Sequence, residues 1–202
     1  MRATSDRFFV LTGGPGSGKT TLIEALGAAS FPTSVEAGRA VIRDQSAIGG
    51  PALPWNDPAA FAELMLSWEM RSYAIALVAD GTVFFDRGMP DVVGYLRLTG
   101  LPVPAHIEKA AEVFRYNRKV FILPPWPHIF SQDTERRQSF GEARRTFDAM
   151  AETYARFGYD LISVPTGPIV ERMEFICKQT GVGMGLPKDP ESAKCGLRQP
   201  QA

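Results

Sequence analysis

The sequence predicts a three-layer α/β domain in which a five-stranded parallel sheet carries helices on both faces. Three observations favour this class. Short apolar runs bounded by glycine or proline, typical of strands buried on both sides, alternate with longer segments that repeat apolar residues at helical spacing. A glycine-rich segment directly follows the first run. The third run ends in charged residues, and ligands bind at that end of the strands in open α/β sheets.

Length and composition restrict the possible classes. The 202 residues suffice for one domain, expected at 1–180, and residues 181–202 lack apolar periodicity and are expected to form a flexible tail. Lys plus Arg and Asp plus Glu each number 22, so no overall field favours nucleic acid or an anionic membrane. Two cysteines are too few for a disulfide framework, and no apolar run is long enough to span a membrane. We therefore expect a cytoplasmic protein, monomeric or homodimeric.

The glycine-rich segment is the strongest chemical signal. Residues 13–20 satisfy the Walker A pattern between an expected strand at 8–12 and an expected helix at 19–29. The glycines let backbone N–H groups converge on phosphate oxygens, and the helix N-terminus adds partial positive charge. Lys19 supplies a cation for the outer phosphates, and Thr20 supplies a hydroxyl for Mg²⁺. The predicted nucleoside triphosphate site comprises Gly13, Gly14, Pro15, Gly16, Ser17, Gly18, Lys19, Thr20 and Thr21.

Four further segments complete the expected sheet. A weak strand is expected at 33–36, and stronger ones at 83–85, 120–123 and 159–164. Helical spacing or helix-start signals predict helices at about 39–45, 57–79, 90–98, 105–115 and 169–178, and another that ends at Gly158.

Three charged residues follow these strands and are candidates for catalysis. Asp86 is a Walker B candidate that could hold magnesium, although an aspartate there could also cap the next helix. Arg87 suits contact with phosphate, or else an ion pair with Asp91. Glu36 could accept the proton of an attacking hydroxyl, or pair with Arg39 instead.

Two later segments could complete a nucleotide site. Residues 126–140 have no strand pattern and are dense in charge, so they form a candidate lid. Arg136 and Arg137 in it could bring positive charge to the transferred phosphoryl group when the site closes, or could belong to a solvated helix face. The turn after the fifth expected strand could pack on the nucleotide base through Pro165, Thr166 and Gly167.

Four stretches together resemble a small P-loop family, the AAA-type ATPase/kinase domain grouped with the kinase domain of NadR, the nicotinamide riboside kinase. They are residues 12–21, 35–39, 84–91 and 123–126, and the resemblance runs from about 8 to 178. It implies a nucleoside-kinase-like core with sheet order 2-3-1-4-5 and an arginine-bearing lid. It also implies that Lys19 and Thr20 hold the phosphates and magnesium and that Glu36 acts as base. The Asp-Arg pair of such kinases maps to Asp86 and Arg87.

Two functions fit these residues. The first is a magnesium-dependent kinase that moves the γ-phosphoryl of ATP or GTP to a small-molecule acceptor. The second is a regulatory ATPase or GTPase switch with slow hydrolysis and a protein partner. The guanine-reading pattern Asn-Lys-x-Asp is absent from the sequence, yet the choice of base stays open.

Overall fold

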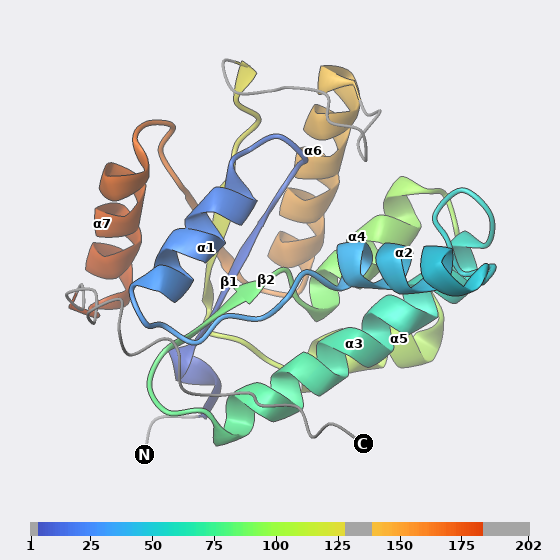
Figure 1. Cartoon of the computed structure of the whole chain (residues 1–202), viewed down its shortest axis with the longest axis horizontal. Coiled ribbons are helices and arrows are strands. Elements are labelled where there is room, and N and C mark those ends of the chain that lie inside the picture. Colours follow the sequence, from blue (N-terminus) through green and yellow to red (C-terminus); the bar gives the residue numbers. More distant parts are fainter. Residues whose placement is uncertain (1–3, 128–138, 184–202) are drawn as a thin grey trace, which may run out of the picture.

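The computed structural model describes residues 4–127 and 139–183, which form a parallel sheet of four strands with helices on both faces (Figure 1). The strands are β1 (Phe8–Gly13), β2 (Val83–Asp86), β3 (Lys119–Leu123) and β4 (Asp160–Ser163), in the order β2-β1-β3-β4. The helices are α1 (Lys19–Ala28), α2 (Ala37–Ile48), α3 (Pro58–Val78), α4 (Met89–Leu98), α5 (Ala105–Val113), α6 (Phe140–Arg156) and α7 (Ile169–Thr180), and a 3₁₀ turn (Thr4–Arg7) precedes β1.

The two faces of the sheet pack against different sets of helices. Phe8 and Val10 of β1 belong to a core cluster with residues of α2, α3, α4, α5 and α6. Phe9 and Leu11, which alternate with them, belong to a second cluster with residues of α1 and α7. This alternation follows from the two-residue period of a strand, and both clusters are apolar because both faces are covered. The predicted three-layer α/β class is therefore confirmed.

The expected strand at 33–36 does not form in the structure; only one isolated bridge lies there. Thr33 makes an isolated parallel bridge to Phe84 of β2, and the ladder does not continue. The next backbone donor of β2 on this edge, the N–H of Asp86, donates to the hydroxyl of Ser34 at 2.9 Å. A side chain thus takes the place of the next backbone carbonyl, and Glu36 already forms the N-cap of α2. The four strands keep the expected order, with the bridge where strand 2 was expected.

Local signals set the helix ends. The Asp57 carboxylate accepts a hydrogen bond from the N–H of Ala60 at 2.9 Å, and Pro58 occupies the first turn of α3. Ser139 and Glu142 form a capping box at the start of α6. Gly49 ends α2 in the left-handed conformation, with φ 66°.

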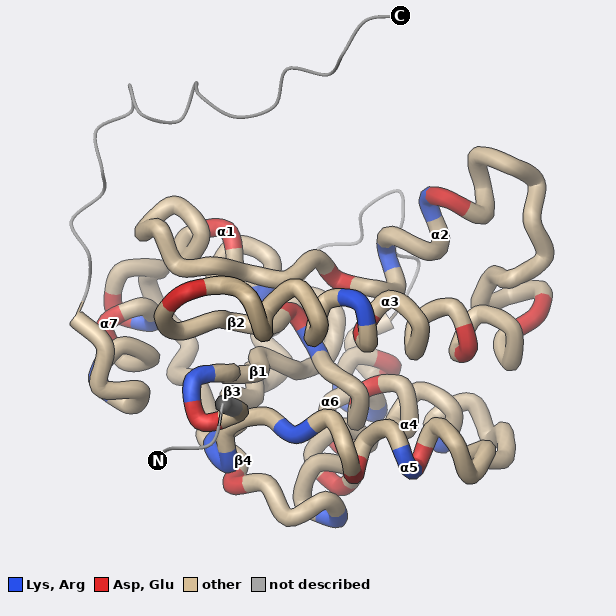
Figure 2. Tube along the Cα trace, turned by 90° about the horizontal axis from the view of Figure 1, so that it is seen from below, with Lys and Arg blue, Asp and Glu red and all other residues tan. Residues whose placement is uncertain are grey.

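The distribution of charge agrees with the composition. Figure 2 shows acidic and basic residues interspersed over the described elements, without a basic stripe. None of the helices in the described ranges is long and apolar enough to cross a membrane. Most of the expected lid, with Arg136 and Arg137, lies outside the described residues, and so does the expected tail from residue 184 onward.

Candidate functional site

The phosphate loop between β1 and α1 adopts the backbone conformations that its glycines permit. Gly16 and Gly18 have φ values of 70° and 74°, which residues with a side chain rarely adopt. The Ser17 hydroxyl donates to the carbonyl of Gly14 at 2.9 Å and closes the turn. Gly18 is the N-cap of α1, so the first N–H groups of that helix, which lack helical partners, are available at the loop.

Two later helices support this loop from outside. A Cβ at Gly14 would overlap the backbone carbonyl of Ala143 in α6, so only glycine fits there. Arg172 of α7 is buried and donates to the carbonyls of Ser17 and Gly18 at 3.2 and 3.3 Å. Burial lowers the pKa of Arg172. The loop is therefore held by α6 and α7 as well as by its own hydrogen bonds.

Lys19 lies at the centre of a cluster of charged side chains. Its ammonium group is bonded to the carboxylate of Asp86 and lies 3.7 Å from Glu36 Oε2. Glu36 in turn pairs with Arg39 at 3.2 Å and with Arg87 at 3.0 Å. The cluster forms here because β1 and β2 are parallel neighbours, so the residues that follow them meet at one edge of the sheet.

Arg87 is held in an uncommon backbone conformation. Its φ of 73° lies in the left-handed region, which costs about 1–3 kcal/mol for a residue with a side chain and persists only where the surroundings fix it. The guanidinium donates to Glu36 at 3.0 Å and to Asp91 at 2.9 Å. Burial alone would lower the pKa of Arg87, but Glu36, Asp91 and Asp86 outweigh burial and raise it. Arg87 is therefore charged and fixed in direction.

Asp91 joins Arg87 to the core of the domain. Besides Arg87, its carboxylate accepts hydrogen bonds from the hydroxyls of Thr12 in β1 at 2.5 Å and Tyr154 in α6 at 2.6 Å. It also accepts one from the N–H of Gly88 at 3.0 Å and so caps α4. Four donors compensate the burial of this carboxylate, as a buried charge requires.

Asp86 and Thr20 are the residues that the sequence predicts to hold a divalent cation. Burial raises the pKa of Asp86, and the attraction of Lys19 opposes the rise. Thr20 is half-buried in the first turn of α1. No group of three acidic, His or Cys side chains gathers as a metal cage within 4–127 and 139–183. Mg²⁺ commonly binds through one or two protein oxygens and the phosphates of its nucleotide, and the Asp86 carboxylate and the Thr20 hydroxyl are oxygen donors of that kind.

Glu69 of α3 was missed by the sequence interpretation. It is 2 % exposed, and its Oε2 has no hydrogen-bond partner within the described part of the chain. Burial, and then the charges of Asp91 and Asp86, raise its pKa well above the ordinary value. A signal was present: Glu69 lies four and eight residues after Met65 and Phe61, on the buried stripe of the helix.

The remaining predicted residues lie at the same edge of the sheet or outside the residues that the structure describes. Pro165, Thr166 and Gly167 connect β4 to α7, beyond the carboxyl end of β4, and Pro165 and Thr166 are exposed. Thr21 is exposed in the first turn of α1. Arg136 and Arg137 are not among the described residues, so their role stays a prediction.

Comparison with known families adds to this geometry. A family model described as "AAA domain" matches residues 8–172, from the first residue of β1 to Arg172. The chain belongs to this AAA domain family. The match includes the phosphate loop and every residue of the charged cluster. No curated protein matches the sequence.

Solved structures with low identity share the fold of this AAA domain. NadR in complex with NR is 18 % identical with a TM-score of 0.63, over 89 % of this chain and 52 % of NadR. Deoxyadenosine kinase from M. mycoides is 12 % identical with a TM-score of 0.62, over 86 % and 98 %. Thymidylate kinase from Ehrlichia chaffeensis is 16 % identical with a TM-score of 0.56, over 85 % and 97 %. The AAA domain thus spans about half the NadR chain and has a fold like that of nucleoside and nucleotide kinases.

Proposed function

We propose that this AAA domain is a magnesium-dependent kinase that transfers the γ-phosphoryl of ATP, or less favourably of GTP, to a nucleoside-like or other hydroxyl acceptor. The observation that carries the proposal is the convergence of Lys19, Asp86, Glu36 and Arg87 beside the phosphate loop. The fold supports it, since a NadR structure with a TM-score of 0.60 was solved with NAD and AMP-PNP, and other similar structures are kinases.

The phosphate loop and Lys19 hold the triphosphate in this proposal. The backbone N–H groups of residues 13–21, apart from Pro15, which has none, surround the phosphates, and the Lys19 ammonium exchanges its contact with Asp86 for phosphate oxygens. Thr20 and Asp86 would hold Mg²⁺, and the bound ion would neutralise charge on the phosphates. Pro165, Thr166 and Gly167 contact the nucleotide base.

Glu36 and Arg87 serve the acceptor side. The Glu36 carboxylate takes the proton from the acceptor hydroxyl while the new oxygen–phosphorus bond forms and the bond to the β-phosphate breaks, releasing ADP. Arg87 neutralises the transferred group, and its double anchor keeps it in place before the substrate arrives. Arg136 and Arg137 supply further positive charge when the lid closes.

The deciding experiment is a screen for acceptor-dependent ADP release. Nucleosides, riboside cofactor precursors and sugars are tested with ATP or GTP in the presence of Mg²⁺. The proposal expects one acceptor class to raise ADP release by about 10²-fold or more over the rate without acceptor, because a bound, oriented hydroxyl competes with water. Slow hydrolysis that no acceptor stimulates would instead favour the regulatory ATPase.

Two variants test the residue roles. Glu36→Gln is expected to keep nucleotide binding and lower transfer by about 10²–10⁴-fold, the usual contribution of a general base. Glu24→Gln, an exposed glutamate on α1, is the matched control and is expected to have no effect. Lys19→Ala is expected to abolish detectable ATP binding by calorimetry. Unchanged affinity in that variant would refute the phosphate site.

A further inference from the structure

Helix α3 exposes an apolar stripe that the nucleotide site does not use. Leu64, Trp68, Arg71, Ile75 and Val78 follow one another at steps of four, three, four and three residues. This is the spacing of a helix seam that packs against another helix. Ile75 is 59 % exposed and Val78 is 86 % exposed. Arg71 is the one polar residue in the stripe.

The opposite face of α3 is already buried. Phe61, Met65 and Leu66 of this helix belong to the core cluster that covers the sheet. A helix that is apolar on its inner and its outer side is typical of a helix covered on both sides. The outer stripe is therefore expected to have a packing partner outside the described part of the chain.

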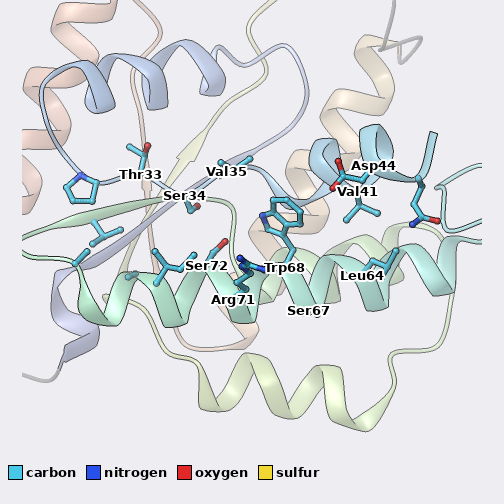
Figure 3. Close-up of a pocket in the computed structure, with 16 residues that line it drawn as sticks. Thr33, Ser34, Val35, Val41, Asp44, Leu64, Ser67, Trp68, Arg71 and Ser72 are labelled. Carbon is cyan, nitrogen blue, oxygen red and sulfur yellow. The ribbon is translucent and has the colours of Figure 1, made fainter. Parts of the chain in front are cut away.

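The stripe, apart from Val78, forms one side of a groove of about 620 Å³. Its other sides are α2, with Val41 and Asp44, and the segment 32–35 that lies along β2. Figure 3 shows side chains from these elements arranged around the groove, with the indole of Trp68 standing between α3 and the segment that carries Val35. The groove is mainly apolar and lies on the outer side of the sheet edge.

The charges in the groove indicate which partner fits. Asp44 and Arg71 are the two charged side chains that line it, and they have opposite signs. Asp44 pairs with its neighbour Arg43 at 3.2 Å on the surface, and Arg71 makes no hydrogen bond or ion pair with the rest of the described chain. A second copy related by a two-fold axis would present its aspartate to Arg71 and its arginine to Asp44, because such an interface uses the same patch twice.

We propose that two copies of this chain form a symmetric dimer in which the α3 stripe of each copy packs antiparallel into the groove of the other. A helix of 21 residues is about 30 Å long, and a pair of adjacent helices is about 20 Å wide. The product of these lengths is a flat area of about 600 Å², and the uneven surface of the side chains makes the accessible area larger. This area approaches the roughly 800 Å² per partner of a stable interface.

The test measures molar mass by light scattering after size exclusion over a range of protein concentrations. The wild type is expected to show twice the 22.1 kDa of one chain at about 50 µM. Ile75→Glu is expected to be monomeric at that concentration, because it buries a charge in the stripe. The matched control is Val170→Glu on α7, where the side chain is 56 % exposed, and it is expected to remain dimeric.

A charge swap keeps the proposal testable if Ile75→Glu fails to fold. Arg71→Asp and Asp44→Arg are each expected to raise the dissociation constant about tenfold, since each places like charges together at both symmetric contacts. The double variant is expected to restore wild-type association. A monomeric wild type at about 50 µM, a dimer that Ile75→Glu leaves intact, or a double variant no better than the singles would overturn the proposal.

Discussion

Replacing Asp91 by alanine tests how much the hydrogen bonds that Asp91 accepts stabilise the folded domain. The carboxylate accepts bonds from the hydroxyls of Thr12 and Tyr154, from the Gly88 N–H and from the guanidinium of Arg87. Leaving two buried hydroxyls unpaired costs about 1–3 kcal/mol each, and breaking a buried ion pair costs about 3–5 kcal/mol. We take the low end because Arg87 keeps a second carboxylate, and we expect the free energy of unfolding to fall by about 5 kcal/mol.

Urea unfolding followed by circular dichroism measures this loss. A fall of about 5 kcal/mol is a large part of the 5–15 kcal/mol of a typical domain, and it can leave Asp91→Ala unfolded. The milder substitution Asp91→Asn is therefore the companion variant. Asparagine keeps the volume and one acceptor oxygen, and a smaller loss is expected from it. A loss of less than about 1 kcal/mol in Asp91→Ala, with an unchanged slope against urea, would refute the reasoning.

Three further variants test single features of the site. Gly14→Ala is expected to lower the free energy of unfolding by about 1–3 kcal/mol, because its Cβ would overlap the backbone of Ala143; an unchanged melting temperature would contradict this. Glu69→Gln is expected to remove a pH dependence of the free energy of unfolding. Burial raises the folded pKa of Glu69, so the folded state keeps a proton that the unfolded chain loses above about pH 4.3, and wild-type stability falls as pH rises from there towards the folded pKa. Urea unfolding from pH 5 to 8 checks this, and parallel curves for variant and wild type would exclude it. Arg172→Ala is expected to reduce the nucleotide-dependent rise in melting temperature, since two charge-assisted bonds to the phosphate loop are lost, whereas an equal rise would show that the loop needs no such support.

Much of the fold could be predicted because the sheet is parallel and buried. Strands covered on both faces consist of short apolar runs, and the runs at 83–85 and 120–123 correspond to β2 and β3 within two residues. The same topology explains why Lys19, Glu36 and Asp86, which are distant in sequence, could be assigned to one place. Residues that follow adjacent parallel strands meet at the same edge.

The features that sequence could not supply depend on tertiary packing. The expected strand at 33–36 has the composition of a strand, but the hydroxyl of Ser34 replaces its ladder, and no pattern in four residues distinguishes the two outcomes. Arg172 looks like any helix arginine until α7 is placed against the phosphate loop. Tyr154 likewise has the spacing of a core residue, and its bond to Asp91 depends on how α6 and α4 pack.

The contact between Gly14 and Ala143 ties the position of one helix to the shape of the phosphate loop. Helix α6 begins at Phe140, directly after the segment 126–139, so any displacement of its first turns moves the carbonyl that faces Gly14. Packed interiors transmit such shifts because they are nearly incompressible. The position of the first two turns of α6 is therefore coupled to the geometry of the phosphate loop, and a spectroscopic label placed there is expected to respond when a polyphosphate binds.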